Sequence, residues 1–185
     1  MTRYWFMTST FYGNWLPGDS RGSVSGRHFL NDNKIINNQF GDTYDSSMPN
    51  LESFSRKQMK GPPVQLNLDQ ARLVMRQFRE TTAVRGWHMP AAAIMHNHMH
   101  WLVAAAEADL AATILRDYKA YASRKLTQCY GRPASGTWWT EGGSTRLLPD
   151  EAGVARVTEY VAAQKNPLVV WVAGEWLVGG EGDGE

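Results

Sequence analysis

The sequence predicts an α+β domain: a ferredoxin-like split βαβ unit with an antiparallel sheet and helices on one face. Two observations support this prediction. The expected elements follow the order strand, helix, strand, strand, helix, strand, and a further helix near the C-terminus completes the series. The two middle strands are separated only by His96-Asn97, which is typical of an antiparallel hairpin. At 185 residues with 43% hydrophobic content, the chain can bury one sizeable core.

The strands are expected where aromatic and β-branched residues gather. Residues 4–12 form the first strand, and residues 88–95 and 98–105 form the hairpin. A short fourth strand is expected over residues 145–148. Residues 20–63 are rich in Asn, Ser, Asp, Gly and Pro and show little periodicity, so we expect a long loop insertion there.

The helices are expected where apolar residues recur at helical spacing behind a residue that can cap a helix. Asn67 begins a helix that ends at Gly86. Asp109 caps a second helix, and Asp150 opens a third that ends near Pro167. The order of these elements is the basis for the fold prediction.

The charge of the chain is unevenly distributed. The net charge is +1, but residues 1–62, 63–149 and 150–185 carry +2, +4 and −5 in turn. Arginine dominates the basic middle region, and guanidinium groups suit phosphate better than lysine does. The near-neutral total therefore conceals a basic middle region that suits a phosphate-bearing partner, but taken alone this composition favours a solvated helix surface.

Domain limits and compartment follow from the same composition. Residues 1–167 are expected to form a single domain, and residues 168–185 an apolar extension with a flexible acidic tail. The single cysteine, Cys129, excludes an intramolecular disulfide and a cysteine-rich zinc site, so we expect a reducing compartment. The sequence has no signal peptide and no run of membrane-spanning length, which predicts a cytoplasmic protein with no membrane partner.

The tripeptide His98-Met99-His100 is the first candidate functional motif. Alternate residues of a strand point to the same face, so both imidazoles are expected to project together from a central strand. A His-x-His pair alone is weak evidence for a metal ion, but its apolar neighbours strengthen the case, because burying two imidazoles on a sheet face requires a compensating partner. His96 shares their parity but lies in the expected turn, where a structural or supporting role is predicted.

The last helix carries the second candidate motif. Tyr160 and Gln164 are four residues apart, so their side chains lie on one face about one turn apart. Val157 and Val161 mark the packed stripe of this helix, which leaves Tyr160 and Gln164 on an adjoining flank. This flank can meet the sheet where the two histidines emerge, although an isolated tyrosine in this position is more often a boundary aromatic.

Together these residues resemble the HUH single-tyrosine transposases, in particular the bacterial REP-associated tyrosine transposase-like group. The run Met95–His100 is similar to the family's Met-Pro-Asn-His-x-His motif, with His96 in place of the proline. Tyr160 and Gln164 match the family's nucleophile and the glutamine that completes its metal site. The resemblance covers roughly residues 4–22 and 68–167. Three further segments within these ranges are similar to members of the group: Tyr12–Gly22, Tyr118–Arg124 and Trp138–Arg146.

The resemblance implies a metal-dependent transposase or endonuclease. Such an enzyme cleaves and rejoins single-stranded DNA, commonly hairpin-forming DNA, through a 5′-phosphotyrosine intermediate. It implies Tyr160 as the catalytic residue and His98, His100 and Gln164 as ligands of Mg²⁺ or Mn²⁺. The resemblance also implies that the protein can function as a homodimer. No nucleotide cofactor is expected, because none of the phosphate-loop signatures occurs in the sequence.

The candidate DNA contacts are of two kinds. Tryptophans in glycine-rich loops are the candidates for exposed platforms, because base stacking contributes roughly 1–3 kcal/mol per base. Basic residues near the motifs are the candidates for phosphate contacts. The tryptophans are Trp15, Trp138 and Trp139, and the basic residues are Arg21, Lys119, Arg124, Arg146 and Lys165.

Two other functions remain open on the sequence. One is a catalytically inactive protein, derived from such a transposase, that binds single-stranded or hairpin DNA. The other is a metal-dependent phosphodiesterase that uses water and releases its product without a protein-linked intermediate.

Overall fold

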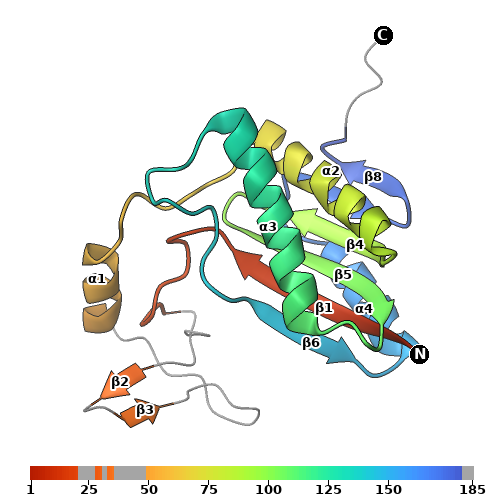
Figure 1. Ribbon diagram of the computed structural model, residues 1–185, viewed down its shortest axis with the longest axis horizontal. Helices are drawn as coiled ribbons and strands as arrows, with labels where there is room; N and C mark the ends of the chain where they lie inside the picture. The colour runs from red at the N-terminus through yellow and green to blue at the C-terminus, as the bar shows by residue number, and fades with distance from the viewer. Residues whose placement is uncertain (21–27, 31–32, 36–48, 181–185) are drawn as a thin grey trace.

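The computed structural model describes residues 1–20, 28–30, 33–35 and 49–180. Its central feature is a six-stranded antiparallel sheet in the order β6-β1-β5-β4-β7-β8 (Figure 1). Its strands are β1 (Thr2–Thr10), β4 (His88–Ile94), β5 (His98–Ala106), β6 (Ser144–Leu148), β7 (Val169–Val172) and β8 (Glu175–Val178). A separate two-stranded sheet consists of β2 (His28–Leu30) and β3 (Asn33–Ile35).

Helices cover both faces of the six-stranded sheet. α2 (Leu68–Arg85) and α3 (Ala111–Tyr130) lie side by side on one face, and α4 (Glu151–Ala162) lies on the other (Figure 1). Met99 and Trp101 of β5 pack beneath α2 and α3, whereas Ala91 and Ala93 of β4 pack beneath α4. The predicted α+β class with an antiparallel sheet is confirmed, and the helix that carries Tyr160 lies on the face opposite α2 and α3.

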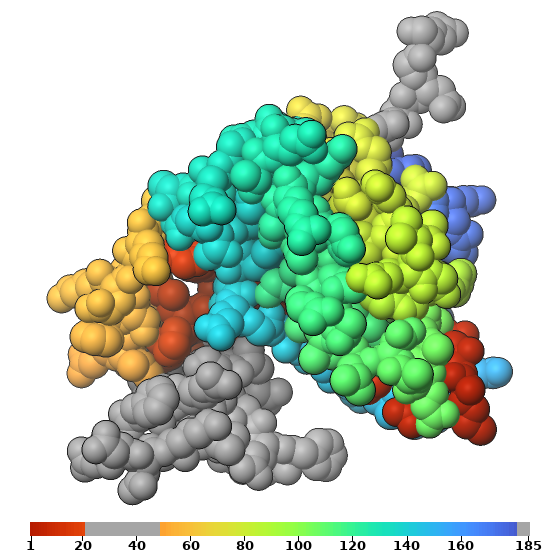
Figure 2. Space-filling model, in the orientation of Figure 1, coloured from red at the N-terminus to blue at the C-terminus, as the bar shows by residue number. Residues whose placement is uncertain are grey.

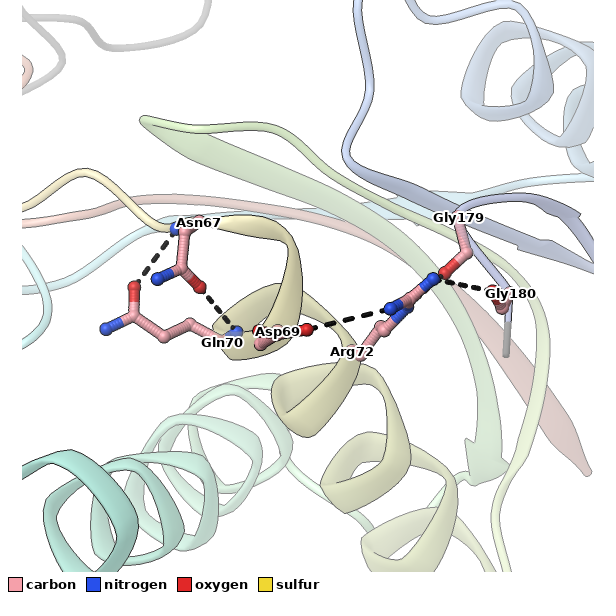
Figure 3. A network of polar contacts seen from close by, with 6 residues as sticks. All are labelled: Asn67, Asp69, Gln70, Arg72, Gly179 and Gly180. Atoms are coloured by element: carbon pink, nitrogen blue, oxygen red, sulfur yellow. Dashed lines mark hydrogen bonds and ion pairs between the residues drawn. The ribbon is translucent and has the colours of Figure 1, made fainter. Parts of the chain in front are cut away.

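α2 begins and ends at the residues that the sequence indicates. Asn67 Oδ1 accepts a hydrogen bond from the Gln70 N–H at 2.9 Å, and Gln70 Oε1 accepts from the Asn67 N–H at 3.0 Å (Figure 3). This reciprocal pair is a capping box, which satisfies two backbone donors at the start of the helix. Gly86 ends the helix with a φ of 67°, in the left-handed region that favours glycine.

Of the two other helix caps that the sequence predicts, one is present in the structure and one is not. Asp150 caps α4, because its Oδ1 accepts from the Gly153 N–H at 2.6 Å. The prediction that Asp109 caps α3 is wrong. Leu110 is the N-cap and makes no side-chain cap bond, while the Asp109 carboxylate accepts from the indole N–H of Trp87 at 3.0 Å. A buried indole N–H needs an acceptor, and it takes the carboxylate that would otherwise cap the helix.

The C-terminal strands extend the sheet beyond β4. β7 pairs with β4, and β8 pairs with β7 at the edge. The Arg79 guanidinium lies 3.9 Å from the centroid of the Trp171 ring, and Arg72 donates to the carbonyls of Gly179 and Gly180 at 2.8 and 2.9 Å (Figure 3). These two arginines from the basic middle region therefore hold the hairpin against α2.

The insertion expected over residues 20–63 contains regular structure. α1 (Pro49–Lys57) lies within it, and none of its residues is buried. Much of the insertion, as well as the acidic tail at 181–185, lies outside the described residues. Within the described part, no helix is both long and apolar enough to cross a membrane.

Candidate active site and DNA-contact residues

The two histidines of β5 lie together on the face of the sheet that α4 covers. Their ring centroids are 5.0 Å apart, with an interplanar angle of 82°. The pairing of β1 with β5 places Thr8 opposite His100 and Thr10 opposite His98. His100 is 8% exposed and His98 is half-buried, so the pair lies at the margin between the core and solvent.

Hydrogen bonds to neighbouring side chains orient both imidazoles. Asn97 Oδ1 lies 2.6 Å from His98 Nδ1, and because an amide oxygen only accepts, this nitrogen donates and the neutral ring keeps its lone pair on Nε2. Thr8 Oγ1 lies 2.8 Å from His100 Nδ1. The sequence did not indicate Thr8, because only the β1–β5 register places it beside His100.

His100 is held in its neutral form. Burial, and secondarily the nearby His98, lower the pKa of His100 from its ordinary value of 6.5 to about 4. Neutral imidazole is the form that ligates a metal ion. His100 is therefore ready to accept a cation at neutral pH without first losing a proton.

α4 brings Tyr160 to the same place. The ring centroids of His100 and Tyr160 are 5.5 Å apart. Phe6 of β1 lies 5.6 Å from the His100 ring and 5.8 Å from the Tyr160 ring, so the three rings contact one another. Tyr160 remains 50% exposed, which leaves its side chain open to a large ligand. Phe6 is a second site residue that the sequence did not indicate.

The position of Tyr160 follows from the packing of α4. Val161 is fully buried, and with Val157 it packs on Ala91, Ala93 and Val170 of the sheet. Tyr160 precedes Val161 and so lies on the flank of the packed stripe, as the helical spacing predicts. The structure therefore brings together His98, His100 and Tyr160 from two distant parts of the chain.

Gln164 lies beyond the end of α4 and contacts its own helix. Its Nε2 donates to the backbone carbonyl of Tyr160 at 3.0 Å. Among the described residues, no hydrogen bond joins Gln164 to His98 or His100. Its role as a metal ligand stays a prediction.

His96 has a structural role, as its place in the turn predicts. Its Nδ1 lies 3.0 Å from the backbone carbonyl of Leu66, which holds the segment before α2 against the hairpin.

The predicted exposure of two tryptophans is wrong. Trp138 and Trp139 are each 6% exposed, because their glycine-rich loop folds back against α3. The Trp138 indole donates to Thr127 Oγ1 at 3.0 Å, and the Trp139 indole donates to the Lys119 carbonyl at 3.0 Å. Trp139 also stacks on Phe11, with centroids 4.8 Å apart. Trp15 is half-buried.

The basic candidates fall on both sides of the sheet. Arg146 of β6 pairs with Phe6 of β1, so it shares the face of the two histidines and is exposed there. Lys165 is exposed just beyond α4. Lys119 and Arg124 lie on α3, where Lys119 Nζ donates to the carbonyls of Thr140 and Gly142 and the Arg124 guanidinium lies 5.2 Å from the Tyr121 ring centroid. Arg21 lies outside the described residues.

Comparisons with known proteins find similarity at the level of solved structures. No family model matches the chain, and no curated protein matches it. A REP-associated tyrosine transposase bound to a REP hairpin is similar at 12% identity and a TM-score of 0.48, covering 86% of this chain. This chain spans only 64% of that protein. A putative transposase from Deinococcus radiodurans R1 is similar at 12% identity and a TM-score of 0.46, covering 90% of this chain and 93% of that one.

Proposed function

We propose that the protein is a metal-dependent transposase-type enzyme that cleaves and rejoins single-stranded DNA, with Tyr160 as its nucleophile. One observation carries the proposal: the Tyr160 ring lies 5.5 Å from the ring of His100, which in turn lies 5.0 Å from that of His98. This arrangement supports the proposal, because two paired imidazoles can bind a cation and an adjacent phenol could then attack a phosphodiester held by that cation.

The residues around this position suit a divalent cation with mixed nitrogen and oxygen ligands. We propose that His98 and His100 provide the nitrogen ligands and that the Gln164 side-chain carbonyl provides an oxygen ligand. Among the described residues, no group of three His, Cys, Asp or Glu side chains is arranged to hold a metal. In the proposed site, substrate oxygens and water would complete the shell. Such a set suits Mn²⁺ or Mg²⁺, with Mn²⁺ favoured by the nitrogens. When bound, the cation would polarise the phosphate as a Lewis acid.

Tyr160 carries out the displacement. Its phenolic oxygen attacks the phosphorus as the bond to the 3′-oxygen breaks, the phenol proton passes to solvent, and the leaving oxygen takes up a proton. The products are a 5′-phosphotyrosine and a free 3′-OH. Attack by the 3′-OH of another strand reverses the step, joins the strands and releases the tyrosine. The number of phosphoester bonds is unchanged, so no nucleotide cofactor is required.

Arg146 is the basic group that we propose for binding phosphate beside Tyr160. It lies on the face of the two histidines, opposite Phe6, and Phe6 contacts both His100 and Tyr160. A guanidinium can hold a phosphate in a bidentate arrangement, which fixes the orientation of the strand. Hairpin-forming DNA is the substrate that the resemblance of the motifs suggests.

A covalent-adduct assay tests the function. The protein is incubated with hairpin-flanked single-stranded DNA and Mn²⁺, and adducts are resolved on a denaturing gel. We expect an adduct that disappears with Tyr160→Phe or with a chelator and persists with Tyr130→Phe, a matched control because Tyr130 is similarly exposed, at 46%. An unchanged adduct in Tyr160→Phe, or no adduct on any hairpin substrate, contradicts the proposal.

One observation favours the inactive DNA-binding alternative: the Gln164 amide donates to the Tyr160 carbonyl and makes no hydrogen bond to a described imidazole. If the metal shell is incomplete for this reason, DNA affinity is expected to survive His98→Ala while cleavage is absent even in the wild type. Product released without an adduct indicates hydrolysis by water instead.

A further inference from the structure

A cavity of about 890 Å³ lies away from the candidate active site, beside α3. Its walls come from the first half of α3, the loop at 135–142 and the segment that follows α1. In Figure 2, N-terminal residues are visible at the bottom of a recess between α1 and this loop. We call this cavity the α3 pocket and define it by Tyr12, Lys60, Leu115, Arg116, Lys119 and Trp139.

The α3 pocket combines aromatic walls with positive charge. Tyr12, Leu115 and Trp139 give the pocket an apolar lining, in which Tyr12 is half-buried and the other two are largely covered, at 8% and 6% exposed. Lys60, Arg116 and Lys119 also line the pocket, against one carboxylate at Glu141. Aromatic walls next to cations are the combination that binds single-stranded nucleic acid, because the base stacks while the phosphate is neutralised.

Lys119 is the most buried of these cations. Its Nζ donates to the carbonyls of Thr140 and Gly142 at 2.7 and 2.6 Å, and an ammonium has a third hydrogen to donate. Burial lowers the pKa of Lys119 to about 8, and Glu141 only partly opposes this effect. The charge is thus incompletely compensated by the protein, and an anion in the pocket would compensate it further.

The pocket continues toward other residues that DNA can contact. A second cavity, of about 330 Å³, shares Tyr12 and Glu141 with it and is lined by Trp15. In the other direction, the loop that carries Glu141 leads directly into β6, where Arg146 lies on the face of the histidines. A strand that passes around the β6 edge can therefore contact both faces of the sheet.

We propose that the α3 pocket binds one nucleotide of the DNA single strand, with the base against Tyr12 and Leu115 and the phosphate on Lys60 and Lys119. The inference rests on the proposed function, in that the substrate is DNA. It assigns two residues suggested by the sequence, Lys119 and Trp139, to a binding pocket separate from the site of cleavage. The pocket anchors the strand at a distance from Tyr160.

Photocross-linking tests the inference without any chemistry at Tyr160. Tyr160→Phe protein in a chelator is irradiated with short oligothymidine that carries 5-iodouracil, and the cross-linked peptides are identified by mass spectrometry. We expect cross-links at Tyr12, the half-buried aromatic residue of the pocket. Cross-links confined to β1 and β6 on the histidine face overturn the proposal. So does binding of inorganic phosphate without any oligonucleotide cross-link in the pocket.

Salt dependence provides the second measurement. Lys60 is exposed at the pocket, so Lys60→Met removes charge without removing a buried contact. Lys125→Met, at a half-buried position of α3 outside the pocket, is the control for loss of one positive charge. For oligothymidine, we expect Lys60→Met to reduce the slope of log K against log salt by about 0.7, the value for one phosphate contact to a single strand, with no change in Lys125→Met. Equal slopes in both variants overturn the proposal.

These outcomes separate the two hypotheses. Cross-links in the pocket, combined with no wild-type adduct, support the pocket and contradict cleavage by Tyr160. A wild-type adduct without cross-links in the pocket supports cleavage and overturns the pocket.

Discussion

Acid should destabilise the metal-free protein through His100. The pKa of this imidazole is lowered from 6.5 to about 4, chiefly by burial and secondarily by His98. Between these two values the unfolded chain binds a proton that the folded chain does not. The stability that neutral His100 contributes is therefore fully present above about pH 6.5 and is lost as the pH falls toward about 4.

The size of the effect follows from the shift. At about 1.36 kcal/mol per pH unit, the shift sets a ceiling of roughly 3 kcal/mol on the contribution of His100. Between about pH 7 and about pH 5, linkage predicts a loss of roughly 2 kcal/mol from this residue alone. His100 is only 8% exposed, so solvent screening reduces this value little.

Urea denaturation in a chelator, at both pH values, measures the effect. We expect the wild type to lose about 2 kcal/mol more stability than His100→Gln, because carboxylates titrate equally in both and cancel. His88→Gln is the control, since His88 is exposed at the start of β4, and it should follow the wild type. An equal loss in His100→Gln, or a His100 imidazole that titrates near its ordinary pKa by NMR, refutes the reasoning.

Three further results are expected. Thr8→Val removes the partner of His100 Nδ1 and should weaken Mn²⁺ binding, followed by electron paramagnetic resonance, by about tenfold, whereas Thr8→Ser should retain it. Equal affinity in the two variants contradicts a role for the hydroxyl. Asn67→Ala removes the cap of α2 and should cost about 1 kcal/mol in urea denaturation, while Asn67→Asp should cost less. Arg79→Ala should speed amide hydrogen exchange in β7, because the guanidinium covers Trp171, and unchanged exchange would show that this contact is unimportant.

The sequence predicts the elements that local patterns define. Asn67 and Gly86 limit α2 because capping and left-handed backbone conformations depend on neighbours along the chain. α1 was not predicted because it lies within a stretch rich in Asn, Ser, Asp, Gly and Pro, whose composition favours a loop. The pairing of β7 with β4 could not be predicted either, because it joins residues that are far apart in the sequence.

The same distinction applies to the candidate site. The shared face of His98 and His100 follows from strand parity, and the position of Tyr160 follows from helical spacing. Thr8 and Phe6 were missed because the pairing of β1 with β5, and the crossing of α4 over the sheet, bring them beside these residues.

The error at Trp138 and Trp139 has a similar cause. Glycine-rich composition predicts a loop but not the direction in which the loop folds. The hydrogen bonds from the two indoles to α3 turn both rings inward, and burial of two large aromatic surfaces favours this arrangement over exposure.

The path of α4 constrains how Tyr160 can move. The helix leaves the sheet at β6, on one edge, crosses the face and re-enters it at β7, which lies between β4 and β8. Short connections therefore join the two ends of α4 to β6 and β7. Delivering this tyrosine to a second copy of the chain would require β7 and β8 to detach from β4 and travel with the helix, which would expose the β4 edge. Removing the residues after 167 would release one of these two connections, so the C-terminal hairpin anchors the helix that carries Tyr160.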